Sequence, residues 1–458
     1  MSGLAGKFAE LTRSRNYRFD TLMTSGWVIF GKSFGFFVQL FIAFFFGANR
    51  QTDLFFLAFT ILLYVTVAIG EAPRRALVLF IAEKTSCRDD PNGFLNHVLT
   101  SGWLLLAVLL GLIAAGLPPL MRMTALYDEN ATATLMRHFL LGAPMVFFIC
   151  GTCWVSGLLD YHKKFWISAA APALRSAAAL AVLFAFRRHW GIYAAMAGYV
   201  VGEAALFLVT VSAARRITGF RPQWRVGDPR RLGPFVSTAG FLVAASAAAL
   251  ASSVVDRLVA SWVGAGNLSL LQYSSTIVFT LHGVFIAGFE TVLIAYWSEA
   301  FHSGRNRAGL RANFALRAVE TLAISVPVCL ICWFFRQEIA RLLFLRGSFP
   351  PQAAPELAEI FGLQVFALIP WPILIALSHY FIVIRKTGVL FAAALIRVVL
   401  AVACDLALAP RLGVRGIALS TTIQTSLLAL FLYSYFVRGG REARTRPTSE
   451  TSPGATFE

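Results

Sequence analysis

Residues 22–72 decide the fold class, and they read LMTSGWVIFGKSFGFFVQLFIAFFFGANRQTDLFFLAFTILLYVTVAIGEA. Two apolar runs, at 22–47 and 54–72, flank a short polar turn. A run of about 20 apolar residues is long enough to cross the hydrocarbon core of a bilayer as a helix. This stretch therefore predicts a membrane-spanning helical hairpin at the start of the chain.

The same pattern recurs to Val437 and predicts an all-α polytopic membrane protein of about twelve transmembrane helices. Of the 458 residues, 58% are hydrophobic and 14% are charged, against about 25% charged in soluble domains. The expected spans are 22–47, 54–72, 97–119, 136–158, 167–186, 191–213, 235–262, 268–296, 315–335, 357–384, 388–409 and 415–437.

A long basic linker at 214–234 divides these spans into two six-helix bundles around a central cavity. The N-terminal lobe covers 22–213 and the C-terminal lobe covers 235–437. Residues 1–21 lack the apolar core of a cleaved signal and are expected to form a cytoplasmic tail. Residues 438–458 are rich in Arg, Thr, Ser and Pro, which predicts a disordered cytoplasmic tail.

The distribution of basic residues predicts the orientation in the membrane. With both termini in the cytoplasm, 26 of the 40 Lys and Arg residues lie on cytoplasmic segments and 10 on the opposite side. Cytoplasmic loops of membrane proteins carry such an excess of basic residues. The net charge of +17 therefore needs no nucleic-acid partner.

Weak internal similarity between the halves predicts two parallel repeats. Near the first hairpin of each half, Phe46-Gly47-Ala48 and Thr52 match Val263-Gly264-Ala265 and Ser269, an offset of 217 residues. Near the last hairpin, Gly191-Ile192 matches Gly416-Ile417, an offset of 225 residues. The helix before each Gly-Ile pair carries one arginine, Arg175 or Arg397.

Charged residues inside the apolar spans are the candidate site, because a charge in the bilayer normally faces a partner or a water-filled cavity. The candidate substrate-binding cations are Lys32, Arg175, Arg257 and Arg397. The candidate coupling or gating acids are Asp53, Glu71, Asp256 and Glu290. Three further acids, Glu203, Glu320 and Asp405, fit a structural role better.

Each candidate also has a plainer interpretation. Lys32 would pair with an acid purely for packing, and Asp53, which follows Thr52, would cap its own helix. Glu71 is expected at the end of the second span, far from Asp53. Asp256 and Arg257 are adjacent and point about 100° apart on a helix, so at least one of them must face into the bundle.

Two C-x-x-C pairs lie within apolar spans, at Cys150 and Cys153 and at Cys329 and Cys332. This spacing suits a metal or redox pair in a soluble protein. Here the spans carry no neighbouring His or Asp ligands, so helix packing is the favoured interpretation. We expect no metal site and no resident cofactor.

Three motifs together resemble the MviN-type lipid II flippases of the multidrug, oligosaccharidyl-lipid and polysaccharide exporter superfamily. The motifs are Gly31-Lys32-Ser33-Phe34-Gly35-Phe36 with the following hairpin through Glu71, residues 255–293 from Val255-Asp256-Arg257 to Glu290-Thr291-Val292-Leu293, and Leu345-Arg346-Gly347-Ser348-Phe349. The resemblance implies two lobes and alternating access without bond chemistry. It also implies that Lys32 replaces a family arginine and that Asp53 and Glu71 match conserved acids.

The chain departs from the family pattern at several arginines. The resemblance places family arginines at positions that here hold Val38, Thr66, Val67 and Thr276. The final pair of helices of the lipid II flippases is also missing from the twelve expected spans. The first choice of cargo is therefore an undecaprenyl-pyrophosphate-linked oligosaccharide for a surface polysaccharide, with lipid II as the alternative.

Two other functions remain open at this point. A cation-coupled multidrug exporter would share the architecture. A polyprenyl-dependent membrane glycosyltransferase is less favoured, because the chain has no phosphate-binding loop, no H-E-x-x-H zinc motif and no paired carboxylates in a large loop. We thus expect a monomeric inner-membrane transporter that works beside envelope biosynthesis enzymes and is coupled to H⁺, Na⁺ or the membrane potential.

Overall fold

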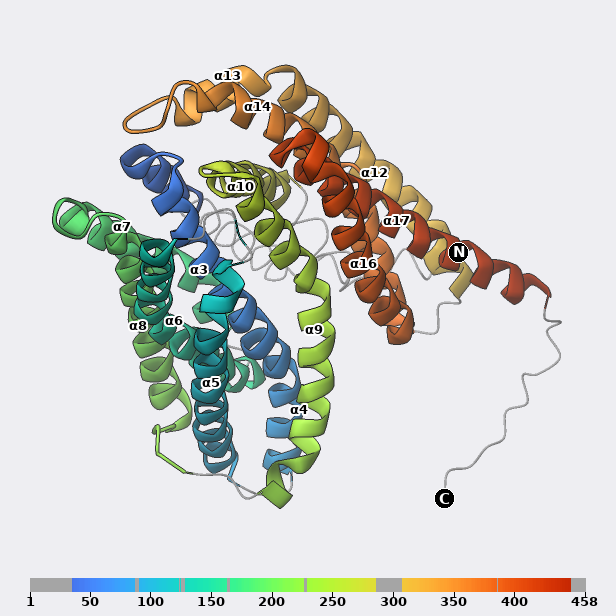
Figure 1. Cartoon of the computed structure of the whole chain (residues 1–458). Helices are drawn as coiled ribbons and strands as arrows, with labels where there is room; N and C mark the ends of the chain where they lie inside the picture. The colour runs from blue at the N-terminus through green and yellow to red at the C-terminus, as the bar shows by residue number, and fades with distance from the viewer. Residues whose placement is uncertain are drawn as a thin grey trace.

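The chain folds into two bundles of helices that meet at one end (Figure 1). A computed structural model describes residues 35–86, 90–122, 124, 128–162, 165–225, 229–285, 307–384 and 386–445. Two of the predicted site residues, Lys32 and Glu290, lie outside these ranges.

The N-terminal lobe contains a short helix and six labelled ones. They are the helix Gly35–Phe46, α3 (Arg50–Thr66), α4 (Ala72–Ser86), α5 (Pro91–Arg122), α6 (Glu129–Tyr161), α7 (Phe165–Trp190) and α8 (Tyr193–Thr218). The C-terminal lobe contains α9 (Pro229–Val263), α10 (Asn267–Phe285), α12 (Arg307–Phe334), α13 (Arg336–Phe344), α14 (Ala353–Gln364), α15 (Pro370–Val383), α16 (Thr387–Leu412) and α17 (Val414–Thr445).

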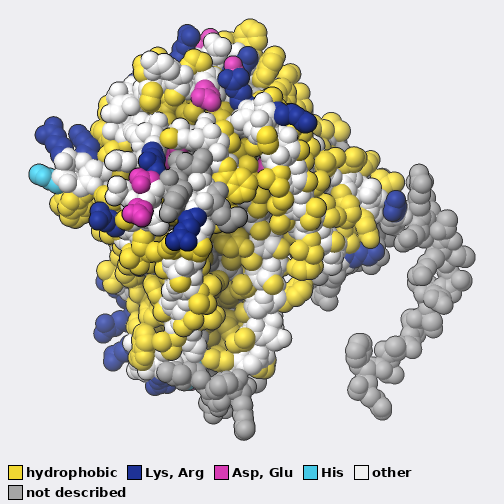
Figure 2. All heavy atoms as spheres, in the orientation of Figure 1, with side chains coloured by type: hydrophobic (Ala, Val, Ile, Leu, Met, Phe, Trp, Pro, Cys, Tyr) yellow, Lys and Arg dark blue, Asp and Glu magenta, His cyan; other side chains and the backbone are white. Residues whose placement is uncertain are grey.

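The described residues confirm the all-helical membrane architecture. Among them, eight helices are long and apolar enough to cross a membrane, and α12 with α13, bent by 73°, is a candidate ninth span. Hydrophobic side chains cover the flanks of both bundles in Figure 2. The count of twelve stays a prediction, since two expected spans, 22–47 and 268–296, run beyond the described residues.

The second span is longer than the sequence indicates. The helix continues from α3 through a π-helical segment, Val67–Glu71, into α4 and ends at Ser86. The expectation that Glu71 lies at the end of this helix is therefore wrong. A π-helical turn leaves a carbonyl without its usual partner and often marks a functional position. Here the Trp154 indole N–H donates to the Ile69 carbonyl at 3.2 Å.

Helix α9 packs against both lobes. Near its start, the Phe235 ring contacts the rings of Phe80 and Phe94 at centroid distances of 5.6 and 5.7 Å. Near its middle, the Tyr64 hydroxyl of α3 donates to the Ala247 carbonyl at 3.1 Å. Its later residues run beside α16 in the C-terminal lobe (Figure 1). The connection between the lobes is thus a helix that both of them hold.

The segment before α9 is attached to the N-terminal lobe. The Asn96 side-chain amide donates to the Arg221 carbonyl at 3.0 Å and accepts from the Gln223 backbone N–H at 2.9 Å. The Arg225 backbone N–H donates to the Thr100 hydroxyl at 3.0 Å. These bonds fix an otherwise irregular stretch along the first turns of α5.

Candidate functional site

The two lobes interlock where three segments meet, and we call this contact the lobe seam. It comprises residues 44–53 of the N-terminal lobe and residues 264–273 and 344–350 of the C-terminal lobe. These segments lie at the end of the molecule where α10, α13 and α14 are found in Figure 1. The contacts across the seam are polar and short.

Asp53 is the central side chain of the lobe seam. It is completely buried, and its carboxylate accepts hydrogen bonds from the backbone N–H groups of Gly266 and Ser269 and from the Ser269 hydroxyl. The first backbone N–H groups of a helix lack partners within it, and an acid there also interacts favourably with the helix dipole. Asp53 thus caps α10 of the opposite lobe, while Asn49 caps its own helix α3.

Equivalent residues of the two repeats touch each other at the lobe seam. The Ser269 hydroxyl donates to the Thr52 hydroxyl oxygen at 2.8 Å, and these two residues are 217 positions apart. Residues on the axis between two copies of a repeat meet their counterparts. The sequence match between Thr52 and Ser269 therefore corresponds to a direct contact.

Two glycines bring the backbones of the two lobes together. Gly47 and Gly347 both have positive φ angles, 71° and 67°. A Cβ on Gly47 would lie 2.5 Å from the Ser348 carbonyl oxygen, and one on Gly347 would overlap the Phe44 carbonyl. The Ser348 N–H donates to the Phe44 carbonyl at 2.8 Å. Any larger residue at either glycine would hold the lobes apart.

Tyr273 completes the lobe seam. Its side chain is fully buried, and its hydroxyl donates to the Gly47 carbonyl at 2.7 Å. Its ring packs against Phe56 and Phe344, each at a centroid distance of 5.4 Å. The polar groups of the seam named here all have partners, which makes this end of the molecule closed.

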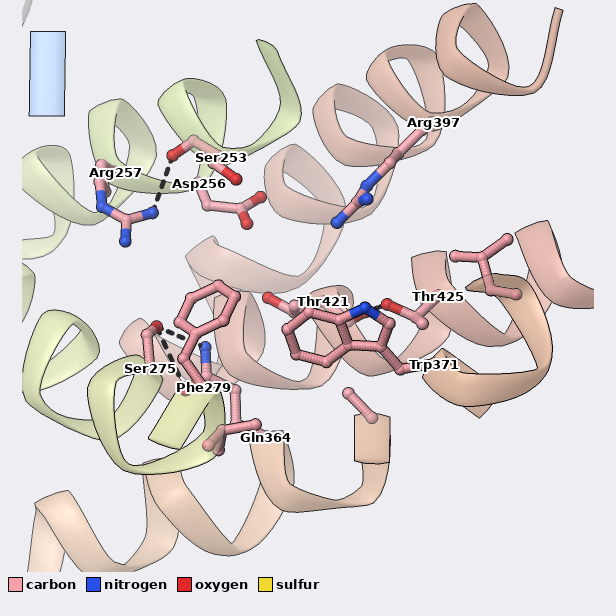
Figure 3. A pocket seen from close by; sticks show the side chains of 13 residues that line it. Ser253, Asp256, Arg257, Ser275, Phe279, Gln364, Trp371, Arg397, Thr421 and Thr425 are labelled. Atoms are coloured by element: carbon pink, nitrogen blue, oxygen red, sulfur yellow. Dashed lines mark hydrogen bonds between the residues drawn. The ribbon is translucent and has the colours of Figure 1, made fainter. Parts of the chain in front are cut away.

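A polar cavity lies inside the C-terminal lobe, between α9, α10, α14, α15, α16 and α17 (Figure 3). It contains about 600 Å³ of space that is not filled by atoms, part of it open to the outside. Sites for small molecules typically measure about 300–1,000 Å³. The side chains that line it are Ser253, Asp256, Arg257, Ser275, Val278, Phe279, Gln364, Ala367, Trp371, Leu374, Arg397, Thr421 and Thr425.

Three of the predicted site residues meet in this cavity. Arg257 is held by the Gln272 side-chain oxygen at 2.8 and 3.1 Å and by the Ser253 carbonyl at 3.1 Å. Asp256 lies between Arg257 and Arg397 and accepts from the Gln424 side-chain amide at 3.5 Å (Figure 3). The Nε of Arg397 is buried and has no hydrogen-bond partner among the described residues.

A second acid stands behind Asp256. Asp405 of α16 is completely buried, and its carboxyl is close enough to Asp256 for the two groups to interact electrostatically. Neither carboxyl oxygen of Asp405 has a donor within the part of the chain that the structure describes. A buried carboxyl without a donor is costly unless it binds a proton or a cation. The sequence favoured a structural role for Asp405, which these contacts do not supply.

Arg175, by contrast, lies in the N-terminal lobe and has a partner. Its guanidinium donates to the Glu203 carboxylate of α8 at 3.1 Å, and Glu203 is buried. Arg175 does not line the C-lobe cavity. The structure therefore separates the four predicted cations: two in one cavity, one in an ion pair, and Lys32 outside the described residues.

Glu71 belongs to a third group, beside the π-helical segment. It accepts a weak hydrogen bond from the Cys153 thiol at 3.4 Å and lies 3.8 Å from the Arg74 guanidinium. Arg74 also binds Asp160 at 2.7 Å. Glu71 remains about half exposed, with 55% of its side chain accessible. In the described ranges, no group of three or more His, Cys, Asp or Glu residues could hold a metal ion.

Sequence reasoning missed the amides and the tryptophan of the cavity. Gln272 and Gln424 each bond a charged residue, Gln364 bonds Ser275 at 3.0 Å, and Trp371 forms part of the wall. A glutamine within an apolar span is itself a signal, because a buried amide needs partners. The same argument that selected the charged residues applies to these three.

Comparison with known proteins gives one consistent result. Residues 42–446 match the family model described as lipid II flippase MurJ. The chain is 22% identical over 420 residues to the probable lipid II flippase MurJ of Thermotoga maritima, covering 90% of this chain and 84% of that protein. It is 26% identical over 444 residues to the lipid II flippase MurJ of Burkholderia cenocepacia, covering 91% and 83%.

Solved structures share the fold. A lipid II flippase MurJ in an inward closed conformation matches with a TM-score of 0.81 and 21% identity, over 91% of this chain and 87% of that one. An inward-facing multidrug resistance transporter of the MATE family, in the MOP superfamily, matches with a TM-score of 0.71 and 15% identity, over 92% and 96%. The expected two-lobe transporter fold is confirmed.

Proposed function

Because this chain belongs to the lipid II flippase MurJ family, we propose that it carries a lipid-linked glycan across the bacterial inner membrane, with lipid II as the cargo. The headgroup would pass between the lobes while the polyprenyl tail stays in the lipid. The observation that carries the proposal is the family match over residues 42–446.

The geometry of the two lobes supports alternating access. The lobe seam closes one end through Asp53, Tyr273 and the paired glycines, whereas the polar cavity lies deeper, between α9, α10 and α14 to α17. In the opposite state the seam would separate, freeing the N-terminus of α10 and the carbonyls of Phe44 and Gly47. Positive-inside topology places the seam on the outer side, so the described state would face the cytoplasm.

Lipid II replaces the surface-polysaccharide precursor that the sequence suggested first. The relatives compared above carry the name of lipid II flippase, and lipid II was the alternative cargo. The likeness to a MATE transporter, at 15% identity, extends to the fold only. A drug exporter and a membrane glycosyltransferase are thus less well supported than a flippase.

The coupling ion and the partners belong to the same proposal. Asp256 and Asp405 form a buried acid pair without enough donors, which suits the binding of H⁺ or Na⁺ during the cycle. The membrane potential can add about 2.3 kcal/mol per charge per 100 mV. We expect a monomer with both termini in the cytoplasm, receiving its glycolipid from envelope biosynthesis enzymes.

Flipping by purified protein in proteoliposomes tests this function. Lipid II, an undecaprenyl-pyrophosphate-linked oligosaccharide and a lipophilic cation would be offered in separate experiments, and the fraction of each on the far leaflet would be scored. We expect lipid II to move fastest. Movement of the oligosaccharide alone would restore the first choice of cargo, and movement of the cation alone would refute a flippase.

A further inference from the structure

Arg175 and Arg397 occupy corresponding places in the two repeats but differ in their surroundings. Each lies in the helix before a Gly-Ile pair. Arg175 is neutralised by Glu203, which stands twelve residues after Gly191; twelve residues after Gly416 stands Leu428. The C-terminal copy of the repeat therefore lacks the acid, and Arg397 is left without a hydrogen bond or ion pair to any described residue.

Arg397 does not point into lipid. Its guanidinium extends into the C-lobe cavity, toward Asp256, on the side opposite Arg257 (Figure 3). A buried guanidinium without a partner is unfavourable, because burial removes the water that would otherwise bind its N–H groups. An arginine retained in this position is best explained by a ligand that binds it.

Arg257 is prepared for the same ligand. Its three hydrogen bonds, to Gln272 and to the Ser253 carbonyl, fix the plane of the guanidinium. They use one N–H on each of its three nitrogens, which leaves two of the five N–H donors free. Arginine donors of this kind match the geometry of phosphate oxygens, which accept two parallel hydrogen bonds.

The remaining lining is suited to the sugar next to a phosphate. Thr421 and Thr425 donate their hydroxyl protons to carbonyls one turn back, at 3.1 and 2.7 Å, so their oxygens remain as acceptors for sugar hydroxyls. The Trp371 and Phe279 rings form an apolar wall on which a sugar ring can pack. Two arginines and one aspartate give the lining a net positive charge, which favours an anion over a cation.

We propose that the C-lobe cavity is an anion subsite in which Arg397 and Arg257 hold a phosphate or pyrophosphate group, with the adjoining sugar against Trp371. That the phosphate comes from a glycolipid rests on the proposed function; the anion chemistry follows from the cavity. The subsite assigns the charged part of the cargo to α9 and α16, away from the paired Arg175.

Binding of inorganic pyrophosphate to the full-length protein in lipid nanodiscs, measured by titration calorimetry, tests the subsite. We expect Arg397→Gln and Arg257→Gln each to weaken binding by about tenfold or more, and Arg397→Lys to keep most of it. Arg415→Gln is the matched control, since Arg415 forms a half-exposed ion pair with Glu359 and lies outside the cavity. Each variant would first be checked for an unchanged elution volume and melting temperature.

The outcomes separate the subsite from the proposed function. Equal pyrophosphate affinity in Arg397→Gln and the parent, or tight binding only of tetraphenylphosphonium through Asp256, would overturn the subsite even if lipid II is flipped. Arginine-dependent binding of pyrophosphate without flipping of any glycolipid would uphold the subsite and reject the function. Competition between lipid II and free pyrophosphate for the parent protein identifies the glycolipid as the source of the phosphate.

Discussion

The lobe seam and the C-lobe cavity use similar polar groups in opposite ways. At the seam, the Asp53 carboxylate receives three hydrogen bonds and the Tyr273 hydroxyl has a backbone acceptor. In the cavity, Arg397 and Asp405 are buried with atoms that have no partner among the described residues. Satisfied groups hold one state of the molecule together, whereas unsatisfied groups indicate where something else must bind.

The largest effect should come from Asp53→Asn at the seam. An amide offers one acceptor oxygen and places an NH₂ group against the N–H groups of Gly266 and Ser269. Hydrogen bonds to a charged group contribute about 1.5–3 kcal/mol each, so the closed seam should lose most of its stability. Spin labels at the exposed positions Glu129 and Gln352, one on each lobe, would report the change by pulsed electron resonance.

We expect the distance between these labels to lengthen in Asp53→Asn and transport to fall by about tenfold or more. Asp53→Glu keeps the charge but is longer and should fall between the two. An unchanged label distance together with normal transport would show that Asp53 does not hold the lobes together.

The next effect should come from Gly47→Ala, with Gly191→Ala as its control. Both glycines have positive φ angles, 71° and 56°, so both alanines bear a backbone cost of about 1–2 kcal/mol. Only the alanine at position 47 would collide with the Ser348 carbonyl, because a Cβ on Gly191 meets nothing within 4 Å. Gly47→Ala should therefore open the seam in the same label measurement, and Gly191→Ala should not.

If both alanines shift the label distance alike, the effect would be backbone strain and not contact between lobes. Gly347→Ala offers an independent check from the other lobe, since its Cβ would overlap the Phe44 carbonyl.

A smaller, opposite pair of effects should distinguish Arg175 from Arg397. Arg175→Leu leaves the buried Glu203 carboxylate without its partner and should cost about 2–3 kcal/mol of stability. Arg397→Leu removes an unpaired charge and should leave the melting temperature unchanged or raise it. Thermal unfolding of both variants in the same detergent provides the measurement. A loss of stability in Arg397→Leu equal to that in Arg175→Leu would show that Arg397 has a structural partner.

The smallest effect should come from Tyr273→Phe. This change removes one hydrogen bond to the Gly47 carbonyl and keeps the ring in its contacts with Phe56 and Phe344. The expected cost is about 1 kcal/mol, and label distances should broaden without a new maximum. A complete opening of the seam would mean that Tyr273, rather than Asp53, dominates the contact.

The sequence predicted the architecture well because membrane solvent leaves few alternatives. Apolar runs of about 20 residues must be helices in a bilayer, since every backbone polar group needs a partner within the segment. The second span is the exception, because it reaches Ser86 and contains a π-helical turn. A single extra residue in a helix leaves no periodic mark that would have predicted it.

The site was predicted in part. Asp256, Arg257 and Arg397 do share a cavity, because a charge in an apolar span has few places to go. Asp53 was correctly selected, but its partners lie more than two hundred residues away and no local pattern shows them. The match of Thr52 with Ser269 held a usable signal, since residues at a two-fold axis meet their copies.

The main-chain contacts of the seam also bear on how the sequence can drift. Ser348 and Phe44 meet through an N–H and a carbonyl, atoms that every residue except proline possesses. Substitutions at these two positions can change the side chain and keep the bond. The information that specifies this part of the closure therefore resides in the absence of side chains at Gly47 and Gly347, where an alignment would record two small letters and no chemistry.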